Sequence, residues 1–269
     1  MVPKFSKIIF VDSHAHLDFD QFDHDRDAVI QNARLANISA IINIGINLET
    51  SKKSIELAET YDFIYATAGI HPHDAGEIKS DQWSELIQLF KHPKIIAVGE
   101  IGLDYYRDYS PRDVQKKVLL KQLDLAIEND LSVIIHTRNA WSDIMPIITE
   151  QYRSKLTGVF HCFSGTEHHA KTLLDLGYFI SFTGVVTFKN ANALKIAADY
   201  VPLDRLLLET DCPFMAPVPF RGKRCEPAHI PYIARKIAEA KDIDIAEVAH
   251  QTTENVKQLF GIEVGNKFS

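Results

Sequence analysis

Cysteine is scarce in this chain of 269 residues, which contains only Cys162, Cys212 and Cys225. No two of them have CxxC spacing, and this argues against a disulfide framework and against a thiolate zinc site. Long apolar runs are also lacking, because none approaches the roughly 18 residues that a membrane span needs, and no signal-peptide pattern is present. We therefore expect a reduced, soluble, cytoplasmic protein without a membrane partner.

An excess of positive charge is the next feature that the chain lacks. It has 29 Lys and Arg residues against 36 Asp and Glu residues, which gives a net charge of −7. Proteins that coat nucleic acid without specificity are usually basic, so this class is disfavoured, although a local basic patch is still allowed. Apolar residues make up 46% of the chain, which supports a large core and argues against disorder.

Eight short apolar runs, rich in Ile, Val or aromatic residues, recur along the chain. Because they are continuous rather than alternating, they are typical of strands buried on both faces of a parallel sheet. The runs cover residues 8–12, 39–45, 63–70, 94–100, 131–136, 156–161, 177–182 and 205–210.

Segments with helical periodicity lie between these runs, and a last helix is predicted over 244–260. The others cover 25–37, 114–130, 168–177, 190–200 and 229–241. Eight strands alternating with helices predict an α/β fold, a single (β/α)8 TIM-type barrel with an extra C-terminal helix. A doubly wound open sheet fits the alternation too, but usually has fewer strands. No composition shift marks a boundary, so we expect one domain over 1–269.

The predicted strands end in unusually polar side chains, and the C-terminal strand ends of such a barrel carry its functional residues. A lone histidine in an apolar segment is more often a hydrogen-bonded core residue than a ligand. Many imidazoles and carboxylates at one mouth, however, would be costly to bury unless a cation accepted their lone pairs. The residues concerned are His14, His16, His71, His73, Glu100, His136, His161, Glu209 and Asp211.

Six of these side chains are candidate metal ligands. Strand alternation places His14 and His16 on one face. Imidazole and carboxylate donors without thiolate suit zinc, manganese or iron, and a carboxylate-rich part can hold magnesium. Six ligands exceed the needs of one four-coordinate ion, so we predict two divalent ions (Mg, Mn or Zn) bridged by Glu100. The ligand set is His14, His16, Glu100, His136, His161 and Asp211, with Glu100 and Asp211 as catalytic candidates.

The other polar residues near the strand ends receive different expectations. His71 could contact substrate or shape the turn with Pro72, and His73 is expected to cap the next loop. Glu209 shares the alternation of Asp211, so we expect it to orient a ligating histidine. The same alternation predicts that Cys162 points away from the mouth, toward the helix layer.

A basic loop follows the last predicted strand and contains Arg221, Lys223 and Arg224. Such a triplet is most often solvated, but barrels frequently bind phosphate with the loops after strands 7 and 8. Arg138 and Arg107 are expected over the same face. Guanidinium groups around a metal site suit a phosphodiester, whose oxygens accept bidentate hydrogen bonds. Aromatic residues near this mouth could stack bases, although core packing is their commoner role; they are Tyr105, Tyr106, Phe163, Phe188 and Phe220.

Six stretches resemble the TatD family of metal-dependent hydrolases, within the wider amidohydrolase-like barrels. They are DSHAHLD, GIHPH, VGEIGLDYY, VIIHTRNA, FHCFSG and LLLETDCPFMAPVPFRGKRCEP, in family order over residues 12–227. The resemblance implies a TIM-type barrel, a divalent metal centre at the six positions above and deoxyribonuclease activity, commonly 3′-to-5′ exonucleolytic. It also implies that His71 contacts substrate phosphate. Asn139 and Cys212 depart from the family pattern without removing a ligand.

Residues and resemblance together predict a metal-dependent DNase that acts on single-stranded DNA or 3′ ends. One alternative is hydrolysis of another ester or of a C–N bond on the same site, for example deacylation of aminoacyl-tRNA. A second is a protein that binds metal without turnover, which the full ligand set disfavours. The sequence leaves the oligomeric state open.

Overall fold

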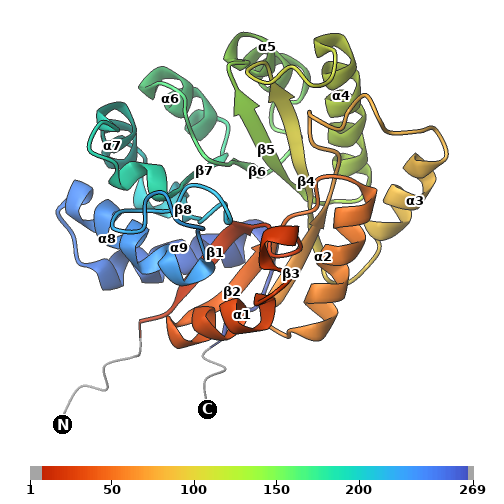
Figure 1. Ribbon diagram of the computed structural model, residues 1–269. Coiled ribbons are helices and arrows are strands. Elements are labelled where there is room, and N and C mark those ends of the chain that lie inside the picture. Colours follow the sequence, from red (N-terminus) through yellow and green to blue (C-terminus); the bar gives the residue numbers. More distant parts are fainter. Residues whose placement is uncertain (1–7, 266–269) are drawn as a thin grey trace.

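Eight parallel strands form the centre of the computed structural model, which describes residues 8–265. They pair with one another in chain order from β1 to β8, and helices surround them (Figure 1). Each strand overlaps one predicted run, and the prediction of a TIM-type barrel is confirmed. The strands are β1 Phe10–Ala15, β2 Ile38–Asn43, β3 Ile64–Ala68, β4 Ile95–Asp104, β5 Ser132–Arg138, β6 Gly158–Phe160, β7 Phe179–Phe182 and β8 Leu206–Leu208. Residues 1–7 and 266–269, which the predicted domain includes, lie outside the described part.

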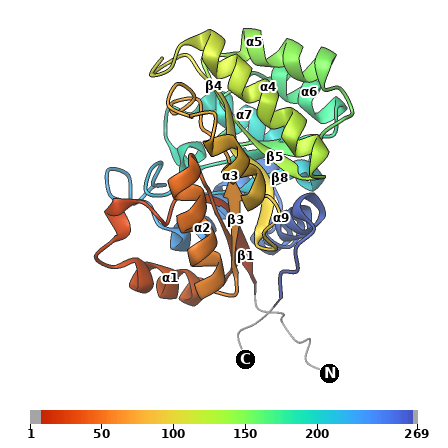
Figure 2. The ribbon, with the colours of Figure 1, turned by 90° about the vertical axis from the view of Figure 1, so that its right-hand side faces the viewer.

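The predicted helices are also present, including the extra C-terminal one. They are α1 Arg26–Leu35, α4 Arg112–Glu128, α6 Glu167–Asp175, α7 Asn192–Tyr200, α8 Ile230–Lys241 and α9 Ile245–Phe260. Three further helices were not predicted, namely α2 Leu48–Thr60, α3 Gln82–Leu89 and α5 Trp141–Pro146. Figure 2 shows α2 over β3, with α3 beside it. None of the helices in the described part is long and apolar enough to cross a membrane.

The barrel closes between β1 and the segment that follows β8. The Ser13 hydroxyl donates to the Leu208 carbonyl oxygen at 3.0 Å. Beyond the strand, the backbone N–H of Asp211 donates to the carbonyl oxygen of His14, and that of His16 donates to Cys212, both at 2.9 Å. The hydrogen bonds that close the barrel therefore also hold three of the predicted ligands side by side.

The described residues form two buried apolar clusters, and helix α9 packs against strand side chains in the smaller one. This cluster joins Val11, Ile42, Ile134 and Leu207 to Val256 of α9. The Asn255 side-chain amide donates to the carbonyl oxygens of Leu203 and Leu206, where β8 begins. The helix thus covers the N-terminal end of the barrel and leaves the C-terminal end to the loops.

Candidate metal centre

The six predicted ligands meet at the C-terminal end of the barrel. His14 lies in β1, Glu100 in β4 and His136 in β5. His16 and His161 come directly after β1 and β6, and Asp211 comes three residues after β8. Parallel strands point the same way, so side chains from distant parts of the chain are brought to one place.

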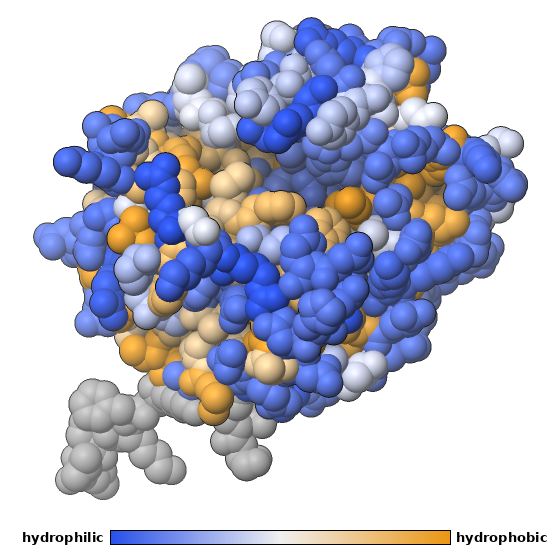
Figure 3. Space-filling model, in the orientation of Figure 1, coloured by the Kyte–Doolittle hydropathy of each residue, from blue (hydrophilic) through white to orange (hydrophobic). Residues whose placement is uncertain are grey.

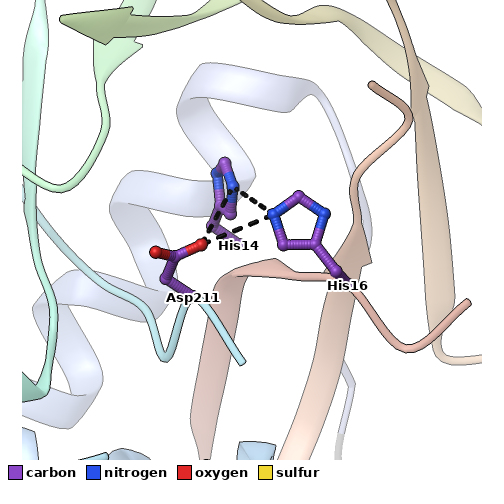
Figure 4. Close-up of side chains that lie close together, drawn as sticks. All are labelled: His14, His16 and Asp211. Atoms are coloured by element: carbon purple, nitrogen blue, oxygen red, sulfur yellow. Dashed lines mark hydrogen bonds and ion pairs between the residues drawn. The ribbon is translucent and has the colours of Figure 1, made fainter. Parts of the chain in front are cut away.

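His14, His16 and Asp211 form one group of donor atoms, all within 4.8 Å of one another (Figure 4). The Nε2 atoms of the two histidines lie 3.3 Å apart. Asp211 Oδ1 lies 3.7 Å from the His14 nitrogen and 3.4 Å from the His16 nitrogen. Burial opposes ionisation of Asp211, but the two imidazoles lower its pKa overall. This carboxyl is therefore a carboxylate at neutral pH.

Glu100 connects this group to a second one. Its Oε2 atom lies 3.3 Å from Nε2 of His14 and 3.8 Å from Nε2 of His16. Its Oε1 atom lies 2.8 Å from Nδ1 of His136 and 2.7 Å from Nε2 of His161. Burial opposes ionisation, yet the surrounding imidazoles hold the Glu100 pKa well below its usual range. One carboxylate thus faces a separate pair of histidines with each of its oxygens.

The spacing of the ring nitrogens fits divalent ions. Nδ1 of His136 and Nε2 of His161 lie 3.2 Å apart, close to the 3.3 Å between the first pair. Two nitrogens bound tetrahedrally to one zinc at ordinary bond lengths lie about 3.3 Å apart. Facing lone pairs at this distance require a proton or a cation between them. The buried donors, imidazole and carboxylate without thiolate, are those of a zinc, manganese or iron site.

Asp104 fixes the orientation of the His136 ring. Its Oδ2 atom lies 3.0 Å from Nε2 of His136 and 3.1 Å from Nε2 of His73. A proton on Nε2 of His136 satisfies the carboxylate and leaves the Nδ1 lone pair facing Glu100 and His161. Carboxylates that hold the far nitrogen of a ligating histidine in this way are general features of metal sites.

His71 differs from the four histidines predicted as ligands in its protonation. Its Nδ1 atom accepts the backbone N–H of His73 at 3.1 Å, and burial lowers its pKa to about 4. The neutral ring therefore carries its proton on Nε2, which lies 3.5 Å from Oε1 of Glu100. His71 offers a hydrogen-bond donor at the centre of the site and no lone pair for a metal.

Glu209 supports the loop that carries His161. Its Oε1 atom accepts the backbone N–H of Cys162 at 2.6 Å and lies 3.6 Å from Nδ1 of His161. Cys162 itself lines the mouth, contrary to the expectation from strand alternation. Strand β6 ends at Phe160, and Cys162 has a φ of 43°, so the alternation no longer applies there. Burial raises the pKa of this thiol to about 12.

A cavity of about 750 Å³ opens over the predicted metal ligands, a size typical of small-molecule sites. Figure 3 shows the molecule hollowed near the loops that follow β8, with apolar residues around part of the hollow. Five of the predicted ligands line the cavity, and so do His71, His73, Arg107 and Arg138; the five are His16, Glu100, His136, His161 and Asp211.

Only the first part of the loop after β8 reaches the cavity, at Phe214 and Met215. Arg221, Lys223 and Arg224 are absent from the cavity lining. The Arg224 guanidinium donates to both carboxylate oxygens of Asp25, at 2.8 and 2.7 Å, and to Glu226 at 3.0 Å. The Arg221 guanidinium lies over the ring of Phe188 at 4.4 Å. In this arrangement the donors of Arg224 are used to anchor its loop.

Two features of the site were missing from the sequence analysis. Asp104 received no role because the predicted strand stopped at Glu100, whereas β4 continues to Asp104. Glu100 and Asp104 are four residues apart, and strand alternation points residues at this spacing to the same side. The alternation could therefore have indicated that Asp104 faces the site as Glu100 does. Of the five aromatic residues proposed near the mouth, only Phe163 lines the cavity. Four others line it unpredicted, namely Phe19, Tyr109, Phe182 and Phe214.

A barrel whose strand ends gather imidazoles around a shared buried glutamate defines a metal-dependent hydrolase of the amidohydrolase-like kind. Comparison with known families agrees with this class. The family described as TatD related DNase matches residues 11–261. The chain belongs to the TatD family of metal-dependent hydrolases.

Individual relatives cover nearly the whole chain. An uncharacterized metal-dependent hydrolase of Bacillus subtilis, YabD, is 43% identical over 251 residues, 93% of this chain and 98% of that protein. A protein of Shigella flexneri named 3′-5′ ssDNA/RNA exonuclease TatD is 35% identical over 257 residues, with 93% and 98% covered. The crystal structure of YJJV, a TatD homologue from Escherichia coli, superposes with a TM-score of 0.88 at 32% identity, covering 94% and 98%.

Proposed function

We propose that this chain is a two-metal deoxyribonuclease that removes nucleotides from the 3′ ends of single-stranded DNA in the cytoplasm. The observation that carries the proposal is the division of Glu100 between two pairs of histidines, at 2.7 to 3.8 Å. A single tightly held ion would use one such pair, whereas phosphodiester cleavage commonly uses two ions bridged by a carboxylate.

Divalent ions bound to these residues would polarise the scissile phosphate and lower the pKa of a bound water. His14, His16, His136 and His161 hold the ions in this proposal, together with Glu100 as the bridge. Asp211 contributes its carboxylate as a ligand and as the acceptor of the proton that the attacking water loses. Its lowered pKa keeps it in the ionised form that this role requires.

The residues around the ligands supply contacts for a phosphate group. His71 lines the cavity beside Glu100, and in this proposal the Nε2–H of its neutral ring donates to a phosphate oxygen. Arg107 and Arg138 line the cavity with exposed side chains. Neither guanidinium has a carboxylate partner among residues 8–265, and both lie against Tyr106, Arg138 at 3.9 Å. We therefore assign the neighbouring phosphate to Arg107 and Arg138 rather than to Arg221, Lys223 or Arg224.

The name of the Shigella relative supports the choice of substrate and of polarity. The Bacillus relative, which is more similar, is named only as a metal-dependent hydrolase. The substrate is consequently the part of the proposal that an experiment must decide.

The test is a matrix of metals and substrates. Protein stripped of metal is reconstituted with Mg²⁺, Mn²⁺ or Zn²⁺ and offered single-stranded DNA labelled at its 5′ end, single-stranded RNA and aminoacyl-tRNA. We expect a ladder of 5′-labelled products that shorten one nucleotide at a time, with at least one of these metals. The variants Asp211→Asn and His161→Ala should lose this activity by at least a hundredfold, while Glu254→Gln on the outer surface should keep it.

Three outcomes contradict the proposal. If the DNA stays intact with every metal, the protein is not a nuclease. If aminoacyl-tRNA is the one substrate turned over, the site catalyses ester hydrolysis instead. Activity that survives both Asp211→Asn and His161→Ala would show that another part of the protein, or a contaminant, cleaves the DNA.

A further inference from the structure

The mouth of the barrel has two chemically different sides. Arg107 and Arg138 follow β4 and β5, whereas Phe19 and Phe214 follow β1 and β8. In a ring of eight strands paired in chain order, β4 and β5 stand across from β8 and β1. The metal ligands lie between these sides, so the cavity is cationic on one side of the site and apolar on the other.

The apolar side is built directly on the ligands. The ring of Phe19 stacks on the imidazole of His16, with centroids 4.6 Å apart and planes at 23°. Phe214 follows Asp211 by three residues, and its backbone N–H donates to the Asp211 carbonyl oxygen at 2.9 Å. The rings of Phe19 and Phe214 form a T-shaped pair, with centroids 6.2 Å apart and planes at 73°. Any ligand held at the metal centre must therefore lie beside these rings.

Two apolar side chains on this side of the cavity are exposed. Phe214 keeps 47% of its surface accessible and Met215, which also lines the cavity, keeps 37%. Exposed apolar groups that are gathered in a concave site mark a surface that a ligand covers. A ligand that fits the whole mouth has a flat apolar part for the phenylalanine side and an anionic group for the metal site. It also has a second anionic group for the arginine side.

We infer that Phe214, supported by Phe19 and Met215, is the binding site for the base of the terminal nucleotide. With the scissile phosphate at the ligands, the base of the departing nucleotide lies on Phe214 and the next phosphate lies between Arg107 and Arg138. This inference rests on the proposed nuclease function. Since stacking on a phenyl ring needs an unstacked base, it also explains a preference for single strands.

The experiment reads stacking separately from cleavage. A DNA strand carries 2-aminopurine at its 3′ end, behind a hydrolysis-resistant phosphorothioate linkage, and its fluorescence is measured on binding to metal-loaded protein. We expect quenching with the native protein and with Phe214→Tyr. Phe214→Ala should abolish the quenching and weaken binding roughly 5- to 150-fold, the effect of losing one base–aromatic stack. Tyr200→Ala, an exposed aromatic outside the cavity lining, serves as the matched control.

A second arm uses cleavable DNA that ends in an abasic nucleotide. The native protein should cleave it with a higher KM than ordinary DNA, and Phe214→Ala should treat the two alike. Unchanged quenching in Phe214→Ala, or equal use of both substrates by the native protein, overturns the base site while the nuclease function stands. A native protein that neither binds nor cleaves DNA overturns the proposed function, and the base site falls with it.

Discussion

At the scale of single residues, Asp104 shows how the site controls the state of its histidines. Its Oδ1 atom accepts the backbone N–H groups of Tyr106 and Arg107, each at 2.9 Å. Its Oδ2 atom faces His136 and His73. Burial opposes ionisation, but these donors hold the Asp104 pKa well below its ordinary value. A carboxylate so fully occupied keeps His136 in one tautomer and one orientation.

We predict that Asp104→Asn weakens metal binding at His136 and His161 by about 10- to 100-fold. The amide accepts through only one oxygen, so it cannot serve the backbone donors and the Nε2–H of His136 equally well. Competition with a chelator on metal-loaded protein measures the affinity. Asp175→Asn, which removes only a surface ion pair with Lys171, is the control. Equal affinities for the two variants would show that Asp104 has no influence on the metal.

The residue types at the strand ends were enough to predict which side chains gather at one end of the barrel, because parallel strands bring their C-terminal ends together. Other assignments depended on contacts that no local pattern contains. Whether Arg224 is free depends on Asp25, 199 residues away in the chain. The proton position of His71 depends on one backbone N–H from His73. Sequence alone therefore indicated which groups gather, and the tertiary contacts decided their chemical state.

At the scale of secondary structure, β4 carries two of the carboxylates that face the histidines, Glu100 and Asp104. It pairs with β5 so that Gly102 lies beside His136. Gly102 has a φ of 150°, and a Cβ atom there would lie only 1.9 Å from the carbonyl oxygen of His136. The close approach of these two strands thus requires a residue without a side chain, midway between Glu100 and Asp104.

We predict that Gly102→Ala lowers the free energy of unfolding by about 3 kcal/mol or more, because backbone strain and a clash with backbone atoms add together. Gly177→Ala is the matched control, since Gly177 also has a positive φ, of 86°, but has nothing within 4 Å of a Cβ atom. That change should cost about 1–2 kcal/mol. Urea denaturation measures both, and equal losses would refute the steric part of the argument.

Helix α9 offers a test of the other end of the barrel. Asn255 is completely buried, and its amide is the donor to the carbonyl oxygens of Leu203 and Leu206, each at 2.8 Å. Asn255→Ala should lower the free energy of unfolding by about 1–3 kcal/mol, since both carbonyl groups lose a buried partner. Glu254→Ala on the surface should change it by no more than about 0.5 kcal/mol. Metal affinity of the folded protein should stay unchanged in both, and a weakened affinity in Asn255→Ala would contradict this separation of roles.

The helices that the sequence did not reveal have a physical explanation. Helix α2 buries Ser51 and Ser54 beside its apolar residues, so its inner face lacks the apolar repeat that marks an amphipathic helix. Helix α5 has only six residues and ends at Pro146. The strands were easier to find because burial on both faces gives each one a continuous apolar run, even where β6 and β8 have only three residues each.

At the scale of the whole molecule, the net charge of −7 conflicts with binding to an anionic polymer unless the attraction is local. Several cations outside the mouth are paired with carboxylates, as in the contacts of Arg224 with Asp25 and of Lys171 with Asp175. Arg107 and Arg138 are without such partners in the described residues and face the cavity. The protein should therefore attract DNA at its mouth and repel it elsewhere.

This distribution predicts a shallow dependence of DNA binding on salt. Each phosphate neutralised on a single strand contributes a slope of about 0.7 in a plot of log affinity against log salt, so two contacts give about 1.4. Arg107→Gln and Arg138→Gln should each reduce the slope by about 0.7, and Lys223→Gln should leave it unchanged because Lys223 lies outside the cavity lining. Titrations of labelled single-stranded DNA at several salt concentrations measure the slopes. A slope several times larger would contradict this, and so would a slope that Lys223→Gln lowers as much as the arginine variants do. Either result would mean that DNA also contacts a basic surface outside the two-sided mouth.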